Sequence, residues 1–328
     1  MPAPPSPASG LLNINKPPGL TSHDVVARIR KLTGQHKAGH TGTLDPMATG
    51  VLLVCLGQAT RLIEYIVTSQ KKYRASIYFG ISTDTLDAEG SITAQQDIST
   101  LTEALLRNIL PAFAGDIEQL PPIFSAIKQR GRPLYKRARA GQEVQVEPRR
   151  VTIYAMKWVA WSPPVLTLDI TCSAGTYIRS LARDLGQAAG TGAHLSGLIR
   201  TANGRWSIDD AIELDQLEQI AQTEPEGWKA YLQPLDTCVL HLPQIILDSH
   251  QVTDVQHGRS IPADTLKSSL ELNENINLTR AYTPAGEFLA ILELVRNDGN
   301  IWQPKKVFQI ITKSDYATIP KPLRRQPK

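Results

Sequence analysis

The stretch from Gly39 to Leu56, GHTGTLDPMATGVLLVCL, constrains the fold of this chain more than any other. Its last six residues, Val51–Leu56, are all apolar and stand between two glycines, which is typical of a strand buried on both faces. A loop of glycines and threonines enters this strand and carries one carboxylate, Asp45. The 328 residues suffice for the large core that such a strand needs, and their number predicts about two domains.

Periodic patterns elsewhere predict intermixed strands and helices. In 21–34, Thr21 and Asp24 form a capping box and Gly34 ends an amphipathic helix. In 71–80, every second residue from Tyr73 to Phe79 is apolar, which indicates a strand. Similar patterns predict strands at 11–17, 150–161 and 165–173, and helices at 59–66, 100–110 (capped by Thr100) and 207–217, while 174–186 is expected to turn from strand to helix. Mixed elements with hairpin-like neighbours indicate an α+β sheet domain, not a doubly wound one.

The character of the sequence changes near Pro243. Residues 11–242 form the predicted α+β domain, whereas residues 243–316 show the short strands and turns of a small all-β domain. The first ten residues, MPAPPSPASG, lack the features of a signal peptide and predict a disordered leader. Residues 317–328 predict a basic, disordered tail.

Apolar runs and cysteine content indicate in which cellular compartment the chain works. No apolar run approaches the roughly 20 residues of a membrane-spanning helix, so no membrane partner is expected. The three cysteines, Cys55, Cys172 and Cys238, form no CxxC pair, which argues against a disulfide framework or a zinc site. These features fit a reducing cytoplasm.

The net charge of +4 is unevenly distributed. Residues 128–150 hold eight basic and two acidic residues and so carry +6, which leaves −2 for the rest of the chain. Such a stretch can bind phosphates by releasing counterions, or it can be a solvated charged face. In the first case, the side chains that we expect to contact phosphates are Lys128, Arg130, Arg132, Lys136, Arg137 and Arg139.

Two roles are open to Asp45. Because Pro46 favours extended geometry in the residue before it, Asp45 can cap a short helical turn. The chain has no GxxxxGK[ST], GxSxG or HExxH motif, so a P-loop, an esterase elbow and a metalloprotease helix are not indicated. A lone carboxylate can also act as a covalent nucleophile if an arginine keeps it ionised and oriented.

Long motifs around Asp45 resemble the TruB family of bacterial tRNA pseudouridine synthases, which act on uridine 55 of the T loop. The first is NKPPGLTSHDVVARIRKLTGQHKAGHTGTLDPMATGVLLVCLGQATRL, and the similarity continues through KKYRASIYFGISTDTLDAEG, LPPIFSAIKQRGRPLYKRARAGQEV and CSAGTYIRSLARDLG. It spans residues 11 to 240 or so, and the C-terminal part resembles the PUA RNA-binding module more weakly. The resemblance implies a pseudouridine synthase fold, a mixed and largely antiparallel sheet with flanking helices, followed by a small PUA-like domain.

The implied reaction breaks the glycosidic N1–C1′ bond, turns the uracil and joins C5 to C1′, so it needs no cofactor. By resemblance, Asp45 is the catalytic carboxylate, Arg179 pairs with it, Tyr177 contacts the base and the reacting sugar, and Tyr73 stacks on the flipped base. Asp45 has three possible roles: attack on C1′, addition to the ring, or removal of a ribose proton. Without the resemblance, Tyr73 would be read as a core residue and Arg179 as a surface residue of its helix.

Three further positions match the family. His40 matches a histidine that enters the T loop, Leu198 an apolar wall of the pocket, and Lys16 a lysine near the active site. Their ordinary alternatives are a loop histidine, a core leucine and a structural lysine. The basic stretch, within about 124–150, resembles a thumb-like insertion that clamps the T arm.

The leading hypothesis is therefore a stand-alone tRNA pseudouridine synthase that flips its target base and needs no obligatory protein partner. Its alternatives are an RNA-binding or RNA-folding protein whose catalysis is lost or incidental, and a synthase that acts on T-loop-like hairpins in other RNAs.

Overall fold

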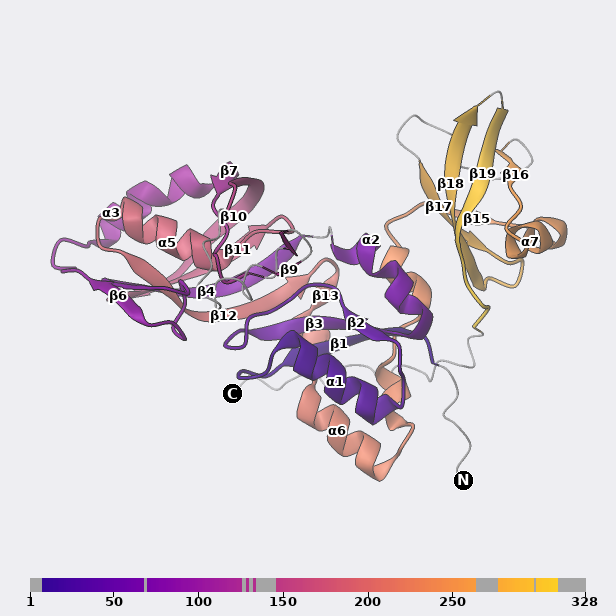
Figure 1. Cartoon of the computed structure of the whole chain (residues 1–328), viewed down its shortest axis with the longest axis horizontal. Coiled ribbons are helices and arrows are strands. Elements are labelled where there is room, and N and C mark those ends of the chain that lie inside the picture. The colour runs from indigo at the N-terminus through magenta and orange to yellow at the C-terminus, as the bar shows by residue number, and fades with distance from the viewer. Residues whose placement is uncertain are drawn as a thin grey trace.

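The computed structural model describes residues 8–67, 70–125, 128–129, 132–133, 146–263, 277–297 and 299–311. Within these residues the chain builds a ten-stranded sheet and a separate five-stranded sheet (Figure 1). The expected leader and tail fall mainly outside the described residues, but Ser9 is buried and Gly10 pairs with Leu56. The ordered sheet thus starts inside the range expected for the leader.

The large sheet is mixed and largely antiparallel, as the resemblance predicts. Only two of its pairs, β1–β14 and β3–β12, are parallel. Its path is β14 (Ile212–Glu213), β1 (Gly10–Lys16), β3 (Thr49–Leu56), β12 (Ala193–Asn203), β4 (Lys71–Phe79), β11 (Val165–Cys172), β10 (Arg149–Ser162) and β7 (Gly115–Gln119), with β2 (Ala38–His40) on β3 and β13 (Trp206–Ser207) on β12. Two small hairpins stand apart: β5 (Ile81–Thr83) with β6 (Ile92–Gln95), and β8 (Lys128–Gln129) with β9 (Arg132–Pro133).

Helices lie against the large sheet, and one short helix, α7, lies beside the five-stranded sheet (Figure 1). The α-helices are α1 (Ser22–Thr33), α2 (Ile63–Val67), α3 (Glu103–Ile109), α5 (Ile178–Ala188), α6 (Leu214–Thr223) and α7 (Ser249–Gln256). Short 3₁₀ turns are η1 (Gly57–Leu62), η2 (Leu110–Phe113), η3 (Ile208–Asp210), η4 (Gly227–Tyr231) and η5 (Leu235–Val239). No helix in the described ranges is long and apolar enough to cross a membrane.

The strongest local patterns are confirmed. Thr21 and Asp24 make the capping box of α1, and Gly34 ends the helix in the left-handed conformation with φ 66°. Val51–Leu56 of β3 is fully buried because the apolar clusters on both faces of the sheet contact it. In β4, the residues that alternate from Tyr73 to Phe79 are buried, as their period of two requires.

Four of the expected helices differ from the sequence prediction. Within 59–66, the 3₁₀ turn η1 extends to Leu62 and α2 begins only at Ile63, and the helix expected within 174–186 begins at Ile178. The helix expected from Thr100 begins at Glu103, and its N-cap is Thr102, whose hydroxyl accepts from the backbone N–H of Leu105. The helix expected over 207–217 begins only at Leu214. Before it, Ile212 pairs with Ile14 as strand β14, and this tertiary pairing overrides the local helical spacing.

The C-terminal region has the expected β-structure. Its sheet runs β15 (Gln244–Ile246), β17 (Leu278–Tyr282), β18 (Phe288–Asn297), β19 (Gly299–Val307) and β16 (Ile261–Pro262). The structure adds the short helix α7, which Asp248 and Gln251 cap reciprocally. That capping box was a sequence signal that the prediction missed.

Candidate active site

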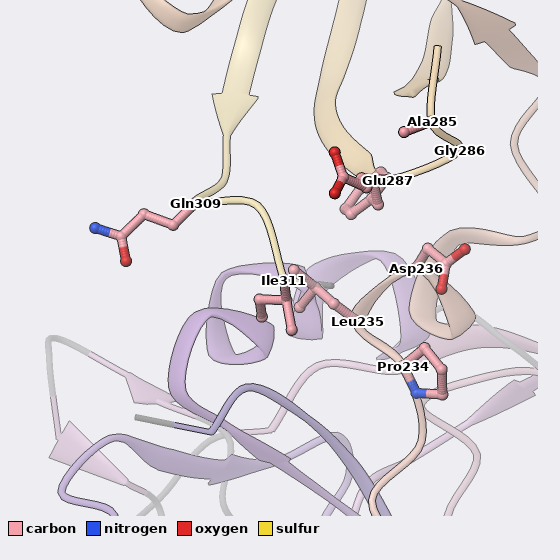
Figure 2. Close-up of a pocket in the computed structure, with 9 residues that line it drawn as sticks. Pro234, Leu235, Asp236, Ala285, Gly286, Glu287, Gln309 and Ile311 are labelled. Atoms are coloured by element: carbon pink, nitrogen blue, oxygen red, sulfur yellow. The ribbon is translucent and has the colours of Figure 1, made fainter. Parts of the chain in front are cut away.

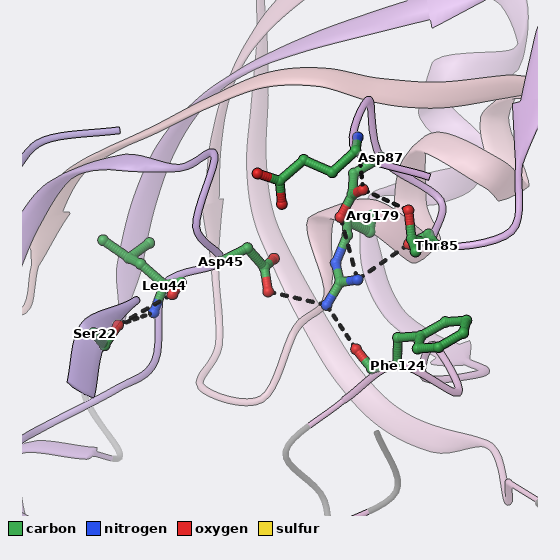
Figure 3. Close-up of polar contacts among 8 residues, drawn as sticks. Ser22, Leu44, Asp45, Thr85, Asp87, Phe124 and Arg179 are labelled. Carbon is green, nitrogen blue, oxygen red and sulfur yellow. Dashed lines mark hydrogen bonds and ion pairs between the residues drawn. The ribbon is translucent and has the colours of Figure 1, made fainter. Parts of the chain in front are cut away.

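The loop that carries Asp45 connects β2 to β3, and α1 fixes its backbone. The hydroxyl of Ser22 accepts from the N–H of Leu44 at 2.8 Å and donates to the C=O of Leu44 at 3.1 Å (Figure 3). The C=O of Asp45 accepts from the N–H of Ala48 at 3.1 Å, which closes a turn. In the described part of the chain no backbone N–H reaches the Asp45 carboxylate, so the capping alternative has no support here.

Lys16 holds the same loop through hydrogen bonds to its backbone. Its side chain is fully buried, and its ammonium donates to the C=O groups of Pro17 at 2.9 Å, Pro46 at 3.0 Å and Ala48 at 2.6 Å. Burial lowers the pKa of Lys16 to about 8, and the nearby charge of Asp45 opposes this shift. The structure thus places Lys16 next to the Asp45 loop and gives it bonds that hold the loop's shape.

Arg200 of β12 braces the loop at both ends. It is 1% exposed, and its guanidinium donates to the C=O of Val51 at 2.6 Å and to the C=O of Gly42 at 3.0 Å. Gly50 must be glycine: its φ is 98°, and a Cβ would lie 2.3 Å from the C=O oxygen of Arg200. The sequence reasoning missed Arg200, although the period of two in β12 puts it on the same face as Leu198.

The carboxylate of Asp45 forms an ion pair with Arg179 (Figure 3). Nη2 of Arg179 donates to Oδ1 of Asp45 at 3.0 Å. The Asp45 side chain is 31% exposed while that of Arg179 is only 7% exposed, so solvent or a ligand can reach the carboxylate but not its partner. No hydrogen bond to Oδ2 of Asp45 is found among the described residues, which leaves this oxygen for other chemistry.

Arg179 is itself held by three other acceptors (Figure 3). Its Nη1 lies 3.3 Å from Oδ2 of Asp87 and donates to the C=O of Thr85 at 3.1 Å. Its Nη2 also donates to the C=O of Phe124 at 3.0 Å. Asp87 is buried and was not singled out from the sequence, because an aspartate in a polar loop gives no sign of the distant arginine that it contacts.

The environment of Asp45 disfavours its ionised form. Burial raises the pKa of Asp45, and the charge of Asp87 adds to this, while Arg179 and Lys16 lower it without cancelling the effect. A carboxylate that is incompletely stabilised remains basic and nucleophilic. Such a perturbed group next to a buried arginine is typical of a functional site.

Burial raises the pKa of both predicted tyrosines, and the charge of Asp45 adds a smaller increase to each. Arg200 opposes the increase in the pKa of Tyr73, and Ser125 opposes the increase in the pKa of Tyr177. Tyr73 is 8% exposed in β4, directly opposite Arg200 in β12. Tyr177 precedes α5, and the amide of Gln119 bonds both its N–H and its C=O.

Of the remaining predicted residues, His40 and Leu198 lie in described strands. His40 ends β2; burial lowers its pKa, and its Nδ1 accepts from the N–H of Gly42 at 3.3 Å. Leu198 is buried in β12 opposite Ala75 of β4. The side chains of the basic stretch, Lys128, Arg130, Arg132, Lys136, Arg137 and Arg139, lie outside the described residues.

A separate groove lies at the junction of the two sheets (Figure 2). Pro234, Leu235 and Asp236 line one side, and the turn of Gly286 and Glu287 lines the other. Its carboxylates are already engaged, because Asp236 accepts from the hydroxyl of Tyr282 and Glu287 from that of Thr283. None of the predicted site residues lines this groove, so the Asp45 centre is the better site.

Family models match residues 30–240 of the chain. Residues 30–178 match the N-terminal domain of the TruB family of pseudouridylate synthases, and residues 179–240 match the C-terminal domain of tRNA pseudouridylate synthase B. A tRNA pseudouridine synthase B of Dehalococcoides mccartyi is 43% identical over 92% of this chain and 96% of its own length. A protein of the same name from Pseudomonas aeruginosa is 41% identical over 89% of this chain and 94% of its own length.

Solved structures show the same fold. An H/ACA ribonucleoprotein bound to a substrate RNA that contains 2′-deoxyuridine holds a chain with a TM-score of 0.69 and 25% identity, covering 94% of this chain and 87% of that one. A chain of a Cbf5–Nop10–Gar1 complex gives a TM-score of 0.68 and 28% identity, covering 94% of this chain and 86% of that one.

Fold and sequence therefore define a pseudouridine synthase, an RNA-modifying isomerase. The chain belongs to the TruB family, and the resemblance inferred from the GTLDP region is confirmed.

Proposed function

We propose that this chain isomerises uridine 55 in the T loop of tRNA to pseudouridine, with Asp45 as the catalytic carboxylate. The single observation that carries the proposal is the ion pair between the accessible Asp45 carboxylate and the buried guanidinium of Arg179. Family membership and the names of the relatives supply the reaction and the tRNA substrate.

The reaction is an isomerisation in which the atoms balance without a co-reactant. The N1–C1′ bond breaks, the uracil rotates, C5 bonds to C1′, and the C5 hydrogen leaves while N1 gains one. Arg179 favours the ionised form of Asp45 against the effect of burial and aims the carboxylate, and the free Oδ2 acts at the nucleoside. Attack on C1′, ring addition and removal of a ribose proton all start from this same ionised oxygen.

The other predicted residues form the walls of the base pocket in this proposal. Extraction of a stacked uridine costs a few kcal/mol, and stacking on an aromatic ring returns roughly 1–3 kcal/mol. Tyr73 supplies that ring and Leu198 an apolar wall, while Tyr177 contacts the base and sugar. His40 stands where the flipped base leaves the loop, and Lys16 keeps the Asp45 loop in shape.

Recognition of the T arm is assigned to two regions. The basic stretch within 124–150 clamps the arm, and the five-stranded sheet, as a PUA-like domain over 243–316, binds RNA beyond it. Binding then weakens steeply as salt rises. Neither region requires a protein partner or a cofactor in this proposal, and the three free thiols fit a reducing cytoplasm.

The test is Asp45→Asn, which keeps the size of the side chain and removes its charge. We expect no release of the C5 hydrogen from uridine 55 and no pseudouridine by chemical mapping, with tRNA affinity within about twofold of the parent protein. Asp215→Asn is the matched control, since this carboxylate is exposed at the start of α6. Equal loss of affinity and turnover would assign Asp45 to fold maintenance instead.

The same assay separates the alternatives. An RNA-folding protein without catalysis binds tRNA but yields no pseudouridine even with Asp45 intact. A synthase for other hairpins modifies a T-loop-like transcript more efficiently than tRNA.

A further inference from the structure

Leu86 has a backbone conformation that leucine rarely adopts. Its φ is 65°, and within the described residues it is the only non-glycine residue with positive φ. The left-handed region costs an ordinary L-residue roughly 1–2 kcal/mol relative to glycine. Such strain persists only where the surroundings enforce it, and it concentrates at functional sites.

The neighbours of Leu86 are two of the acceptors that hold Arg179. Nη1 of Arg179 donates to the C=O of Thr85 at 3.1 Å and lies 3.3 Å from Oδ2 of Asp87. One nitrogen is thus bound by the main chain just before Leu86 and by the side chain just after it. Because Leu86 turns the chain in the left-handed sense between them, both acceptors converge on the same atom.

Backbone bonds on both sides enforce this turn. The N–H of Leu86 donates to the C=O of Thr83 at 3.3 Å, and the C=O of Leu86 accepts from Leu195 of β12 at 3.0 Å. The C=O of Leu195 in turn accepts from the N–H of Ala88 at 3.0 Å. The Leu86 side chain is half-buried and belongs to none of the apolar clusters of the described residues, so its packing does not explain the strain.

We propose that Leu86 is a positioning residue: its left-handed backbone holds the acceptors of Thr85 and Asp87 on Arg179, and through Arg179 it keeps Asp45 aimed. The inference rests on the proposed function, since it assigns a conformational requirement to the same site. What matters at this position is the backbone angle and not the leucine side chain.

The test is a series of substitutions ranked by their tolerance of positive φ. Glycine and asparagine adopt this conformation readily. For alanine its free-energy cost is about the same as for leucine, and for β-branched valine the cost is higher. We expect Leu86→Gly, Leu86→Asn and Leu86→Ala to keep kcat within about twofold. Leu86→Val should lower kcat about tenfold, which corresponds to about 1.4 kcal/mol, with KM for tRNA unchanged.

Two further readouts separate positioning from general damage. In Leu86→Val, displacement of Arg179 should move the acid limb of the pH–rate profile to higher pH, because Asp45 loses part of its partner's support. Ala88→Val is the matched control: it puts the same side chain on an exposed residue of the same loop, and we expect a parental rate and profile. Leu86→Asn should also unfold about 2–4 °C above Leu86→Ala, a comparison that needs no valine variant to fold.

Three outcomes would overturn the inference. A loss in Leu86→Ala as large as in Leu86→Val would assign the effect to side-chain contacts. A parental kcat in folded Leu86→Val would show that the turn does not position Arg179. Equal unfolding temperatures for the Asn and Ala variants would show that position 86 carries no strain. All three are distinct from failure of the proposed function, in which the parent makes no pseudouridine or Asp45→Asn still makes it.

Discussion

The Asp45 centre and the junction between the two sheets use charge in opposite ways. At the centre, Lys16, Arg179, Arg200 and Asp87 are all buried, and backbone C=O groups accept most of the hydrogen bonds from the three cations. At the junction, charged groups pair near the surface. Burial of a charge costs several kcal/mol unless it is well compensated, so the centre holds its geometry at a cost that the junction does not bear.

The junction relies on apolar contact and exposed pairs. Lys306 of β19 forms an ion pair with Glu64 of α2, and the guanidinium of Arg61 lies 4.8 Å from the ring centroid of Phe308. Buried residues from η1, η5 and the C-terminal sheet form one cluster beneath these pairs. Exposed pairs contribute about 1 kcal/mol or less, so this interface should tolerate changes that the centre does not. Four predictions test the contrast, from the largest expected effect to the smallest.

The largest effect is expected for Arg179→Met. The change leaves Asp87 buried without its partner and releases Asp45, so the free energy of unfolding should fall by about 3–5 kcal/mol and pseudouridine formation should fall below detection. Denaturant unfolding and C5 hydrogen release measure the two effects. Arg183→Met, one turn along α5 and partly exposed, is the control and should change little. A stable and active Arg179→Met protein would contradict the role of the buried ion pair.

Arg200→Met should rank second. It removes the donors for the C=O groups of Val51 and Gly42, and each buried acceptor left unpaired costs about 1–3 kcal/mol. Because the Asp45 loop loses its clamp, we expect a drop in kcat along with a loss of roughly 2–4 kcal/mol in unfolding free energy. Arg205→Met, at an exposed position just after β12, provides the comparison. A loss of stability with an unchanged kcat would limit Arg200 to a structural role.

Local signals explain which parts could be predicted from sequence. The capping box at Thr21 and the alternation through Tyr73 are encoded within a few residues, and the structure has both. The helix misplaced over 207–217 had the right local spacing, but pairing of Ile212 with Ile14, about 200 positions away, decided the outcome. Local patterns carry no information about such a partner.

The residues of the candidate site also include some that could be predicted from sequence and some that could not. The sequence pattern singled out Asp45 and the resemblance paired it with Arg179, and the structure brings the two within 3.0 Å although 134 positions separate them. Asp87 was missed because its partner is a distant arginine, and Arg200 because its partners are C=O groups about 150 positions away in the chain. Burial of a charged side chain is a tertiary property, so neither composition nor spacing revealed it.

The third prediction concerns pH. Burial and Asp87 raise the pKa of Asp45, and the proposed reaction needs its ionised form, so activity should be lost as pH falls through a value above the ordinary aspartate range. Asp87→Asn removes one cause of that shift and frees Arg179 for Asp45, and both effects lower the pKa. The acid limb of kcat should therefore move to lower pH, even though the plateau falls because Arg179 keeps fewer acceptors. Asp84→Asn, exposed in the same loop, controls for the local change; a limb that stays in place or rises would refute the electrostatic account.

The smallest effects belong to the junction. Lys306→Met and Glu64→Gln each remove one partner of an exposed ion pair, and a double-mutant cycle should give an interaction of about 0.2–1 kcal/mol that fades at high salt. Neither change touches the Asp45 loop, so kcat should remain parental, and tRNA affinity should change by less than about threefold. If the cycle instead gave several kcal/mol, or if kcat fell with it, the C-terminal sheet would be energetically linked to the Asp45 centre. The contrast between a rigid centre and a tolerant junction would then have to be abandoned, because placement of the second sheet would itself determine how the first holds its carboxylate.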